Sequence, residues 1–293
     1  MTTPQGADPA SALPAAESIA RDVAHALAED LGSGDATADL LDPDAEASAE
    51  LLCRDDAVIA GRAWFDACFR QLDPAARIDW NVRDGEHVAA GAVLCRIHAR
   101  ARALVSAERT ALNFLQTLSG TATRTAQYVA RVAGTGTRIL DTRKTLPGLR
   151  LAQKYAVRCG GGSNHRSGLY DAILIKENHI AAAGGLAAAV RSARRLHPGL
   201  LLEVEVENLD ELDQALAVGV DRVMLDEFTP DMLRQAVGRA SGRVELEVSG
   251  GIALDDLARI ARLGVDYISV GALTKHVHAV DLSLRVRLAG TRD

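Results

Sequence analysis

Hydrophobic residues recur with two different spacings along the chain, and the change of spacing divides it into two regions. In the first region an amphipathic helix is predicted from about residue 17 to a stop at Gly32, because four apolar residues share one face. These residues are Ile19, Val23, Leu27 and Leu31. Short β-rich runs follow at Glu50–Ile59, Ile78–Val82 and Ala92–Ile97. Together they predict a small α+β domain.

The second region contains a long helix and then a regular alternation of strands and helices. The helix is predicted from Ser106, a favourable N-cap, to about Val132. Six short β-rich segments follow, and alanine-rich helical segments separate the later ones. The six segments are Arg138–Leu140, Ala172–Ile175, Leu202–Val206, Arg222–Leu225, Val244–Val248 and Tyr267–Val270. This alternation implies parallel strands joined by right-handed crossovers.

The six units predict an α/β fold with an incomplete, open barrel of about six to seven parallel strands. An open, doubly wound sheet is the competing architecture. No G-x-G-x-x-G motif follows any of the predicted strands, which disfavours the doubly wound sheet. A barrel places its functional groups where the strands end. Polar residues or glycines do follow the predicted strands, at Asp141–Thr145, Lys176–His179, Glu203–Asn208, Leu225–Glu227, Ser249–Gly251 and Gly271–Thr274.

The third predicted strand carries three carboxylates on one face. Glu203, Glu205 and Glu207 alternate with valines, and we expect them to line the barrel interior. An edge strand with a solvated acidic face is the alternative. Asp226, at the end of the next strand, would bring a second carboxylate beside Glu205. Two such carboxylates can hold ribose hydroxyls, bind Mg²⁺ or stabilise an oxocarbenium-like cation.

The charge of the chain is unevenly distributed. The net charge is −6, which argues against general binding to nucleic acid or to anionic membranes. The segment from Arg138 to Lys176, however, contains eight Lys or Arg residues and only two acids, Asp141 and Asp171. Three of the chain's four lysines lie in this segment, although arginine is used nearly everywhere else. The segment therefore predicts a site for anions, with a solvated basic face as the alternative.

Two glycine loops near the C-terminus predict a phosphate site. Ser249, Gly250 and Gly251 precede a helix expected from about Leu254, so that free backbone N–H groups would meet a helix N-terminus. Gly271 and Ala272 supply a second loop, and phosphates in many barrels lie on the loops after the final two strands.

A third glycine loop, Cys159–Gly168, leads into Asn164, His165 and Arg166, which indicates a small polar ligand; a flexible linker is the alternative. No base partner for Cys159 is evident, and we predict no catalytic role for this thiol.

Composition suggests where the protein works. The four cysteines are widely and irregularly spaced, which predicts free thiols in a reducing cytoplasm. The Ala/Pro-rich residues 1–15 predict a disordered tail without signal-peptide character, and no apolar run approaches the ~18 residues of a membrane helix.

Five motifs give the chain a resemblance to the quinolinate phosphoribosyltransferase family. They are Glu29–Thr37, Glu108–Asn113, Asp141–Thr145, Gly161–Arg166 and Lys176–His179. The resemblance covers nearly everything after residue 15. It implies an enzyme of NAD biosynthesis that transfers a phosphoribosyl group from phosphoribosyl pyrophosphate to quinolinate, releasing pyrophosphate and CO₂ and giving nicotinate mononucleotide. It also implies Mg²⁺ as cofactor and a head-to-tail homodimer, with higher assembly left open.

The same resemblance implies a domain organisation. An N-terminal sandwich domain would cover residues 16–118 and be joined by the C-terminal residues 279–293. A phosphoribosyltransferase barrel would cover residues 119–278.

The resemblance also implies roles for individual residues. Arg109 would reach quinolinate in the neighbouring subunit, while Thr142, Arg143, His165 and Arg166 would bind the substrate in their own. Lys144 and Lys176 would neutralise carboxylate and pyrophosphate charge, and Glu205 and Asp226 would serve the ribose and Mg²⁺, chiefly through the phosphosugar. The 5′-phosphate would lie on two loops, formed by Ser249, Gly250 and Gly251 and by Val270, Gly271 and Ala272.

Two other functions compete with this one. A related phosphoribosyltransferase could act on nicotinate or another monoanionic base, but the number of cations is large for a single carboxylate. A non-catalytic phosphosugar-binding protein could share the scaffold, but Lys144, Lys176 and Glu205 are all present, and their loss would have suggested it.

Overall fold

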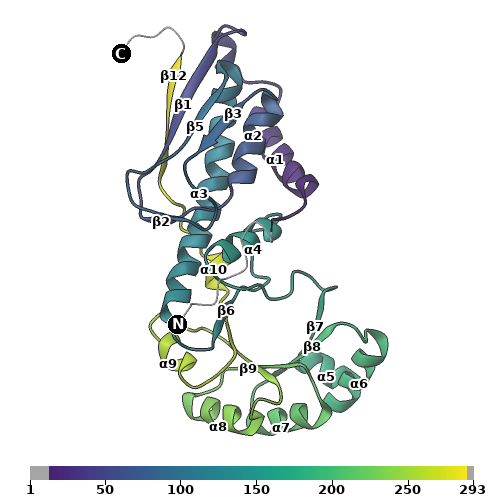
Figure 1. Cartoon of the computed structure of the whole chain (residues 1–293). Coiled ribbons are helices and arrows are strands. Elements are labelled where there is room, and N and C mark those ends of the chain that lie inside the picture. Colours follow the sequence, from purple (N-terminus) through teal and green to yellow (C-terminus); the bar gives the residue numbers. More distant parts are fainter. Residues whose placement is uncertain (1–12, 289–293) are drawn as a thin grey trace. The chain divides into compact units, whose positions relative to one another are not determined.

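The computed structural model describes residues 13–288, which form two compact units (Figure 1). The first unit contains the chain up to Ala126, the segment Leu146–Gly161 and the chain from Thr274 onward. The second contains Gln127–Thr145 and Gly162–Leu273. The tail predicted for residues 1–15 lies almost entirely outside the described residues. The domain limits predicted at residues 118 and 278 stay predictions.

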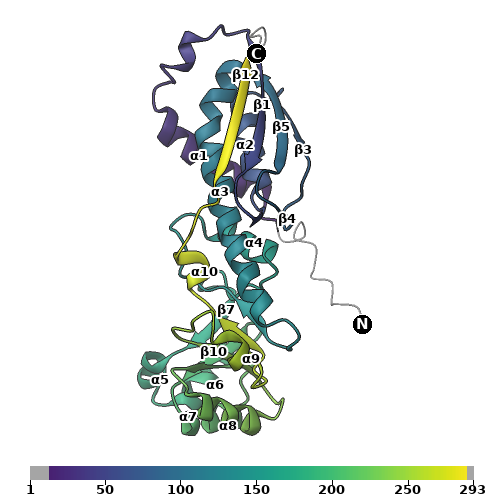
Figure 2. The ribbon, with the colours of Figure 1, turned by 90° about the vertical axis from the view of Figure 1, so that its left-hand side faces the viewer.

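A four-stranded antiparallel sheet forms the centre of the first unit, in the order β12-β1-β5-β3. Its strands are β1 (Glu46–Cys53), β3 (Arg77–Trp80), β5 (Val93–Arg100) and β12 (Leu282–Leu288). Figure 2 shows β12 lying along β1, although more than 200 residues separate Ser48 from its partner Arg287. The sequence alone, without the family resemblance, did not predict this strand.

The run predicted as one strand, Glu50–Ile59, is two. It divides into β1 and β2 (Ala57–Val58), and β2 pairs with β4 (His87–Val88) in a separate ribbon. The charged residues Arg54–Asp56 interrupt the predicted strand, because their polar groups bond to Asp281 and not to a neighbouring strand. The Arg54 N–H donates to the Asp281 carbonyl at 2.8 Å, and an Asp55 carboxylate oxygen accepts the Asp281 N–H at 2.8 Å.

The helices of the first unit include the one predicted near the N-terminus. In α1 (Ala16–Leu31), Ile19, Val23 and Leu27 are buried and Gly32 ends the helix, which confirms the prediction. The long helix α3 (Ala101–Arg131) begins five residues before the predicted Ser106, whose hydroxyl instead donates to Asp35 at 2.7 Å. The remaining helical segments are the 3₁₀ turn Ala38–Leu40, α2 (Arg62–Leu72), α4 (Arg150–Cys159) and α10 (Ala272–Lys275), which starts at the end of the second unit.

The second unit is built on a six-stranded parallel sheet in the order β6-β11-β10-β9-β8-β7. Its strands are β6 (Arg138–Leu140), β7 (Ala172–Ile175), β8 (Leu201–Val206), β9 (Arg222–Asp226), β10 (Glu245–Ser249) and β11 (Tyr267–Ser269). The edge strands β6 and β7 are consecutive in the chain and do not pair in the described structure. The predicted open, incomplete barrel is therefore confirmed, with six strands.

Helices cover the outer face of this sheet (Figure 1). They are α5 (Glu177–Ala183), α6 (Leu186–Leu196), α7 (Leu209–Val218), α8 (Pro230–Ala240) and α9 (Leu257–Ala261). Val204, Val206, Val223 and Leu225 on the central strands are fully buried, so the apolar side of each strand faces the helices. The alternate positions, which are mostly polar, line the barrel interior.

Candidate active site

Two oppositely charged side chains meet where β7 and β8 end. Lys176 directly follows β7, and its ammonium pairs with the carboxylate of Glu205. Glu205 has a side chain only 11% exposed, and Glu203 is fully buried. The alternative of an edge strand is wrong, because β8 lies between β7 and β9. Glu207 lies beyond the end of the strand and is exposed, so it does not share the interior face as predicted.

Asp226 extends this rim on the next strand. The register pairs Glu205 with Met224, so Asp226 lies on the same face two residues further toward the carboxyl end. Asp226 itself pairs with Ser249 at the end of β10. Glu205, Asp226 and Ser249 therefore share one face near the carboxyl ends of three neighbouring strands.

Part of the basic segment gathers at the same end of the barrel. Burial and then repulsion by the guanidinium of Arg143 lower the pKa of Arg166, so the positive charges of these two arginines act on one another. Such a pair binds an anion well, because the anion relieves the repulsion. Not all eight cations contribute: Arg150, Lys154 and Arg158 lie on α4 in the first unit.

Two carboxylates fix the loop between α4 and β7. Asp141 accepts the backbone N–H of His165 at 2.9 Å and the side-chain amide of Asn164 at 2.6 Å. Asp171 accepts the N–H groups of Ser167 and Gly168 at 2.6 and 2.9 Å. The loop is thus ordered by its own hydrogen bonds and is no flexible linker. The sequence placed Asp141 at a strand end but gave neither acid an individual role, although they are the only two acids in the basic segment.

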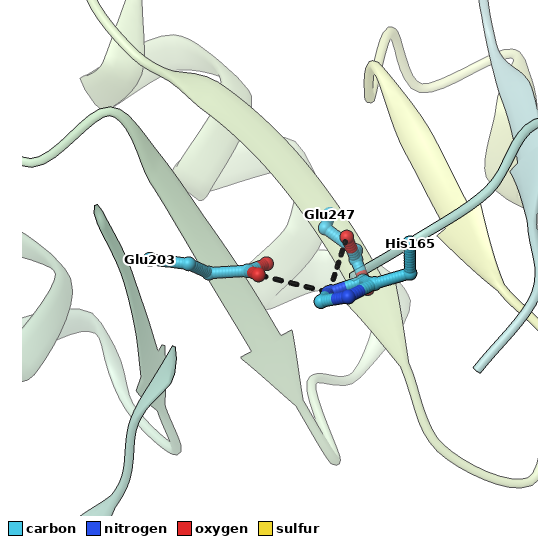
Figure 3. Close-up of side chains that lie close together, drawn as sticks. All are labelled: His165, Glu203 and Glu247. Atoms are coloured by element: carbon cyan, nitrogen blue, oxygen red, sulfur yellow. Dashed lines mark ion pairs between the residues drawn. The ribbon is translucent and has the colours of Figure 1, made fainter. Parts of the chain in front are cut away.

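His165 lies between two buried glutamates of the barrel interior, Glu203 on β8 and Glu247 on β10 (Figure 3). Its Nε2 lies 2.9 Å from Glu203 Oε2 and 3.6 Å from Glu247 Oε2. Burial raises the pKa of Glu203 to about 7 and that of Glu247 to about 8. The sequence analysis missed Glu247, although Glu245 and Glu247 alternate with apolar residues as the β8 glutamates do.

Toward the amino ends of the barrel strands the charges are paired. The Arg222 guanidinium bonds Glu245 at 2.8 Å, approaches Glu247 at 3.4 Å and lies 4.1 Å from the centre of the Tyr267 ring. Tyr267 in turn donates to Glu245 at 2.9 Å and accepts from Arg138 at 2.5 Å. Arg138, the first cation of the basic segment, therefore belongs to this network.

The two predicted phosphate loops follow β10 and β11, but without the expected helix end. The helix after Ser249–Gly251 begins at Leu257 and spans only five residues, whereas a start near Leu254 was predicted. Residues 253–256 form a turn closed by the Asp256 N–H on the Ala253 carbonyl, and the helix begins only after it. Any phosphate at Gly250 and Gly251 would therefore bind to the backbone of the loop itself. Gly250 has φ +125°, a conformation that other residues rarely adopt.

Gly271 allows the loop Val270–Ala272 to lie close to the residues that follow β6. A β-carbon at this position would lie 3.1 Å from Lys144 Cδ and 3.5 Å from Thr142 Oγ1. The loop Val270–Ala272 therefore touches the side chains that follow β6, and a side chain at Gly271 would push that of Lys144 aside.

If Lys144 acts on the substrate as the sequence predicts, Gly271→Ala should lower kcat/KM by about 10-fold, because a functional group displaced by a fraction of an ångström loses its alignment. The thermal midpoint should change little, since Lys144 is exposed and can move. Steady-state kinetics and thermal melting measure the two effects. Gly238→Ala, in helix α8 with open space around it, is the matched control and should keep full activity. Equal kinetics for both variants would contradict a role for this close approach.

Glu247 should make stability depend on pH. Its carboxyl group binds a proton more tightly in the folded chain, with a pKa of about 8 against 4.5 unfolded. Between these values the folded state holds more protons, so its stability falls as the pH rises. We expect Glu247→Gln to gain thermal stability relative to the parent from pH 5 to pH 8, as measured by melting at each pH. A difference that does not grow with pH would contradict the shift.

Two other predicted residues lie in the first unit. Arg109 is exposed on α3, and the other predicted site residues lie in the second unit. Cys159 is buried, and burial raises the pKa of its thiol to about 12, which agrees with the absence of a predicted role. No helix within residues 13–288 is long and apolar enough to cross a membrane.

Comparison with known proteins matches both regions of the chain. Residues 35–119 match the family model "Quinolinate phosphoribosyl transferase, N-terminal domain", and residues 121–285 match its C-terminal domain. A probable nicotinate-nucleotide pyrophosphorylase (carboxylating) of Bacillus subtilis is 40% identical over 266 residues, covering 90% of this chain and 92% of its own. A chloroplastic counterpart from Arabidopsis thaliana is 40% identical, covering 89% and 80%.

Solved structures agree with these matches. The nicotinate-nucleotide pyrophosphorylase of Francisella tularensis superimposes with a TM-score of 0.89 at 47% identity, covering 94% of this chain and 98% of its own. Human nicotinic acid phosphoribosyltransferase superimposes with a TM-score of 0.62 at 16% identity, covering 85% and 71%, which shows a shared fold alone.

Proposed function

The chain belongs to the quinolinate phosphoribosyltransferase family, and we propose that it transfers the phosphoribosyl group of phosphoribosyl pyrophosphate to quinolinate. The products are nicotinate mononucleotide, pyrophosphate and CO₂, which makes it a pentosyltransferase of NAD biosynthesis. The observation that carries this proposal is the grouping of charges at the carboxyl ends of the barrel strands, where Glu205 pairs with Lys176 and the charges of Arg143 and Arg166 repel one another.

The cations divide between the two anionic substrates. We assign Arg143 and Arg166 to the carboxylates of quinolinate, because two like-charged guanidiniums held together match a dianion. Thr142 borders the loop at Gly271, next to Lys144. Lys144 and Lys176 neutralise carboxylate and pyrophosphate charge. The 5′-phosphate is assigned to the backbone of Ser249–Gly251 and Val270–Ala272.

The carboxylates serve the sugar. Displacement of pyrophosphate develops positive charge at C1′ of the ribose, and fixed negative charge nearby stabilises it. Glu205 and Asp226 share one face at the carboxyl ends of neighbouring strands, and neither side chain is fully buried. Lys176 holds the Glu205 carboxylate in place. Orientation supplies much of the remaining rate, because the ring nitrogen needs no proton transfer to attack.

Carboxylate oxygens are the hard ligands that Mg²⁺ prefers, so Glu205 and Asp226 fit a magnesium ion that the oxygens of the phosphosugar also bind. Bound there, Mg²⁺ would supply positive charge for the departing pyrophosphate.

Decarboxylation follows glycosylation. Once the ring nitrogen carries the ribosyl group it is positively charged, and the ring can accept the electron pair that the 2-carboxylate leaves behind. CO₂ departs and a proton takes its place at C2.

The experiment that tests the proposal incubates the protein with quinolinate, phosphoribosyl pyrophosphate and Mg²⁺. Nicotinate mononucleotide and CO₂ should appear in equal amounts. Tight binding of phosphoribosyl pyrophosphate without any turnover would favour a non-catalytic phosphosugar-binding protein instead.

We further propose a cytoplasmic homodimer in which Arg109 completes the site of the neighbouring subunit. The four cysteines are free and buried, which suits a reducing compartment. Arg109 is exposed on α3, where its guanidinium is accessible to a second copy.

A shared site predicts complementation between two inactive variants. Arg109→Ala and Lys144→Ala should each lose activity, because each removes one half of a site. When the two are mixed under subunit exchange, each mixed dimer contains one intact pair, so up to about half of its sites should recover. The measurement is the activity of the mixture, with the extent of subunit exchange determined by mass spectrometry. Exchange without recovery would remove the role of Arg109 in the neighbouring subunit.

A further inference from the structure

Three aspartates of the second unit share one position in the fold, because each directly precedes a strand of the parallel sheet. Asp171 precedes β7, Asp221 precedes β9 and Asp266 precedes β11. The carboxylate of Asp221 accepts the N–H of Leu202 on β8 at 2.7 Å. That of Asp266 accepts the N–H of Leu246 on β10 at 2.8 Å. These two carboxylates thus tie the start of their own strand to the next strand, in the direction that runs from β6 to β7.

Asp171 has the same position at the open edge of the barrel, and it binds differently. β7 is the last strand in this direction, and within residues 13–288 no further strand of the sheet lies beyond it. The carboxylate of Asp171 accepts the backbone N–H of Ser167 at 2.6 Å and that of Gly168 at 2.9 Å. Hydrogen bonds to an ionised acceptor are strong ones. Asp171 therefore closes the turn Ser167–Asp171, through which the chain enters β7.

This turn is the second half of a segment that joins the two edge strands. In the first half, Ser163 pairs with Leu140 at the end of β6. Asp141 then accepts the backbone N–H of the residue before Arg166 at 2.9 Å. Asp171 holds the two N–H groups that follow Arg166. The residue that we assign to a carboxylate of quinolinate therefore lies between two stretches of backbone that carboxylates hold in place.

The closed turn also brings the start of β7 to the side chain of Arg166. The guanidinium donates from one Nη to the carbonyl of Ala172, the first residue of β7, at 3.3 Å. The backbone N–H of Arg166 donates to His165 Nδ1 at 2.7 Å. A guanidinium has five donors, so others remain for the two oxygens of a bound carboxylate. The bond to Ala172 thus sets the direction of the guanidinium and leaves it able to bind an anion.

The charge of Asp171 acts on Arg166 as well. Burial and then repulsion by Arg143 lower the pKa of Arg166, and the carboxylates of Glu203 and Asp171 act in the opposite direction. A carboxylate so near a site for a dianion opposes binding by direct repulsion. Asp171 is exposed, however, so solvent and salt screen part of this repulsion. Its bonds to the turn and its repulsion of the substrate thus have opposite effects on quinolinate binding, and an experiment can separate them.

We infer that Asp171 is a positioning residue for quinolinate: it closes the turn Ser167–Asp171 and so brings the Ala172 carbonyl to the guanidinium of Arg166. This inference rests on the proposed function, in which Arg166 receives a carboxylate of quinolinate. Without the closed turn the arginine would have more arrangements open to it, and fewer of them would meet the substrate.

A purely structural role is the competing explanation, because Asp221 and Asp266 make similar bonds within the sheet. The two explanations differ in what they change. A structural bond contributes to the stability of the fold, whereas a positioning residue changes the KM for one substrate. Asp266 is the better control, because its strand position matches that of Asp171 and its partner is a strand N–H instead of a loop N–H.

The test removes the acceptors of the turn by Asp171→Leu. The KM for quinolinate should rise about 10-fold or more, because a displaced guanidinium loses its alignment. The KM for phosphoribosyl pyrophosphate should stay within about 3-fold, since the groups assigned to it lie on other loops. Asp171→Asn loses the charge but keeps one acceptor oxygen, so it should recover most of the affinity for quinolinate. A merely repulsive Asp171 predicts the reverse, a lower KM for quinolinate in both variants.

The matched control is Asp266→Leu. It should lower the thermal midpoint, because it removes a hydrogen bond within the sheet, and it should leave the KM for quinolinate unchanged. Thermal melting of every variant shows whether it is folded. If Asp171→Leu does not fold, Asp171→Asn against Asp266→Asn decides the question, with a rise of about 3-fold in KM expected for the former alone.

A double-mutant cycle tests whether Asp171 acts through Arg166. In an Arg166→Leu background, Asp171→Leu should cost little more in kcat/KM for quinolinate, because the guanidinium that the turn positions is already gone. Additive losses in the cycle would overturn the inference. So would an unchanged or lower KM for quinolinate in Asp171→Leu. Turnover of quinolinate by the parent in the same assays shows that the proposed function holds whichever way these outcomes fall.

Discussion

Quinolinate should be turned over at least about 10⁴-fold more efficiently than nicotinate, judged by kcat/KM. Quinolinate is a dianion at neutral pH, whereas nicotinate carries one carboxylate. Burial and the neighbouring Arg143 lower the pKa of Arg166, so a monoanion would relieve less of the repulsion between the two guanidiniums than a dianion does. A site built for a polar group rejects the analogue that lacks it.

Quinolinate labelled at the carbon of its 2-carboxylate allows the release of CO₂ to be measured directly. CO₂ should be released only when phosphoribosyl pyrophosphate is present, because the ring must become cationic before it can accept the electron pair. Arg166→Leu is the informative variant: it should lower turnover of quinolinate far more than that of nicotinate and so narrow the preference. Efficient use of nicotinate, or CO₂ released without the phosphosugar, would refute the assignment of these cations.

Replacing Glu205 by Gln should reduce kcat by about 10²–10³-fold, the usual cost of losing a preorganised charge aimed at a developing one. The KM for quinolinate should change much less, because Glu205 shares its rim with Asp226, whereas the arginines proposed to bind the base come from the segments after β6 and before β7. Asp226→Asn should behave in the same way. Steady-state kinetics with each substrate varied in turn distinguishes the two parameters.

Glu207→Gln is the natural control for Glu205→Gln. Glu207 lies two residues further along, beyond the end of β8, and is exposed, so its loss should leave kcat unchanged. If Glu205→Gln instead weakens quinolinate binding while kcat holds, this carboxylate serves the base rather than the ribose.

The sequence predicted the barrel well, because its strands are short apolar runs that end in polar residues. Each predicted barrel strand is found within a residue or two of its limits. The first unit was predicted less well. Its strand β12 pairs with a partner more than 200 residues away, and no local pattern reveals such a pairing. The start of α3 was missed because a tertiary contact, from Arg102 to the Leu41 carbonyl, anchors the first turn.

In the site, residues at strand ends were predictable and those that act through others were not. Lys176 and Glu205 were predicted because each lies at or near the end of a predicted strand. Glu247 lies 3.6 Å from His165 Nε2, although 82 residues separate the two in the sequence and only folding brings them together. Likewise, Arg150 and Arg158 belong to the same basic segment as Arg143, but they lie on α4, which is part of the other unit.

The pairing of β12 with β1 has a consequence for the order in which the protein assembles. A ribosome makes β1, then the whole barrel, and only afterwards β12. Until β12 emerges, β1 is an edge strand with a row of open backbone groups, and such an edge can pair with other nascent chains. The sheet of the first unit, which the ribosome begins first, is therefore completed only after the barrel has been synthesised. Removing β12, or blocking it with a bulky fusion, would turn that temporary edge into a permanent one and favour aggregation in the cell.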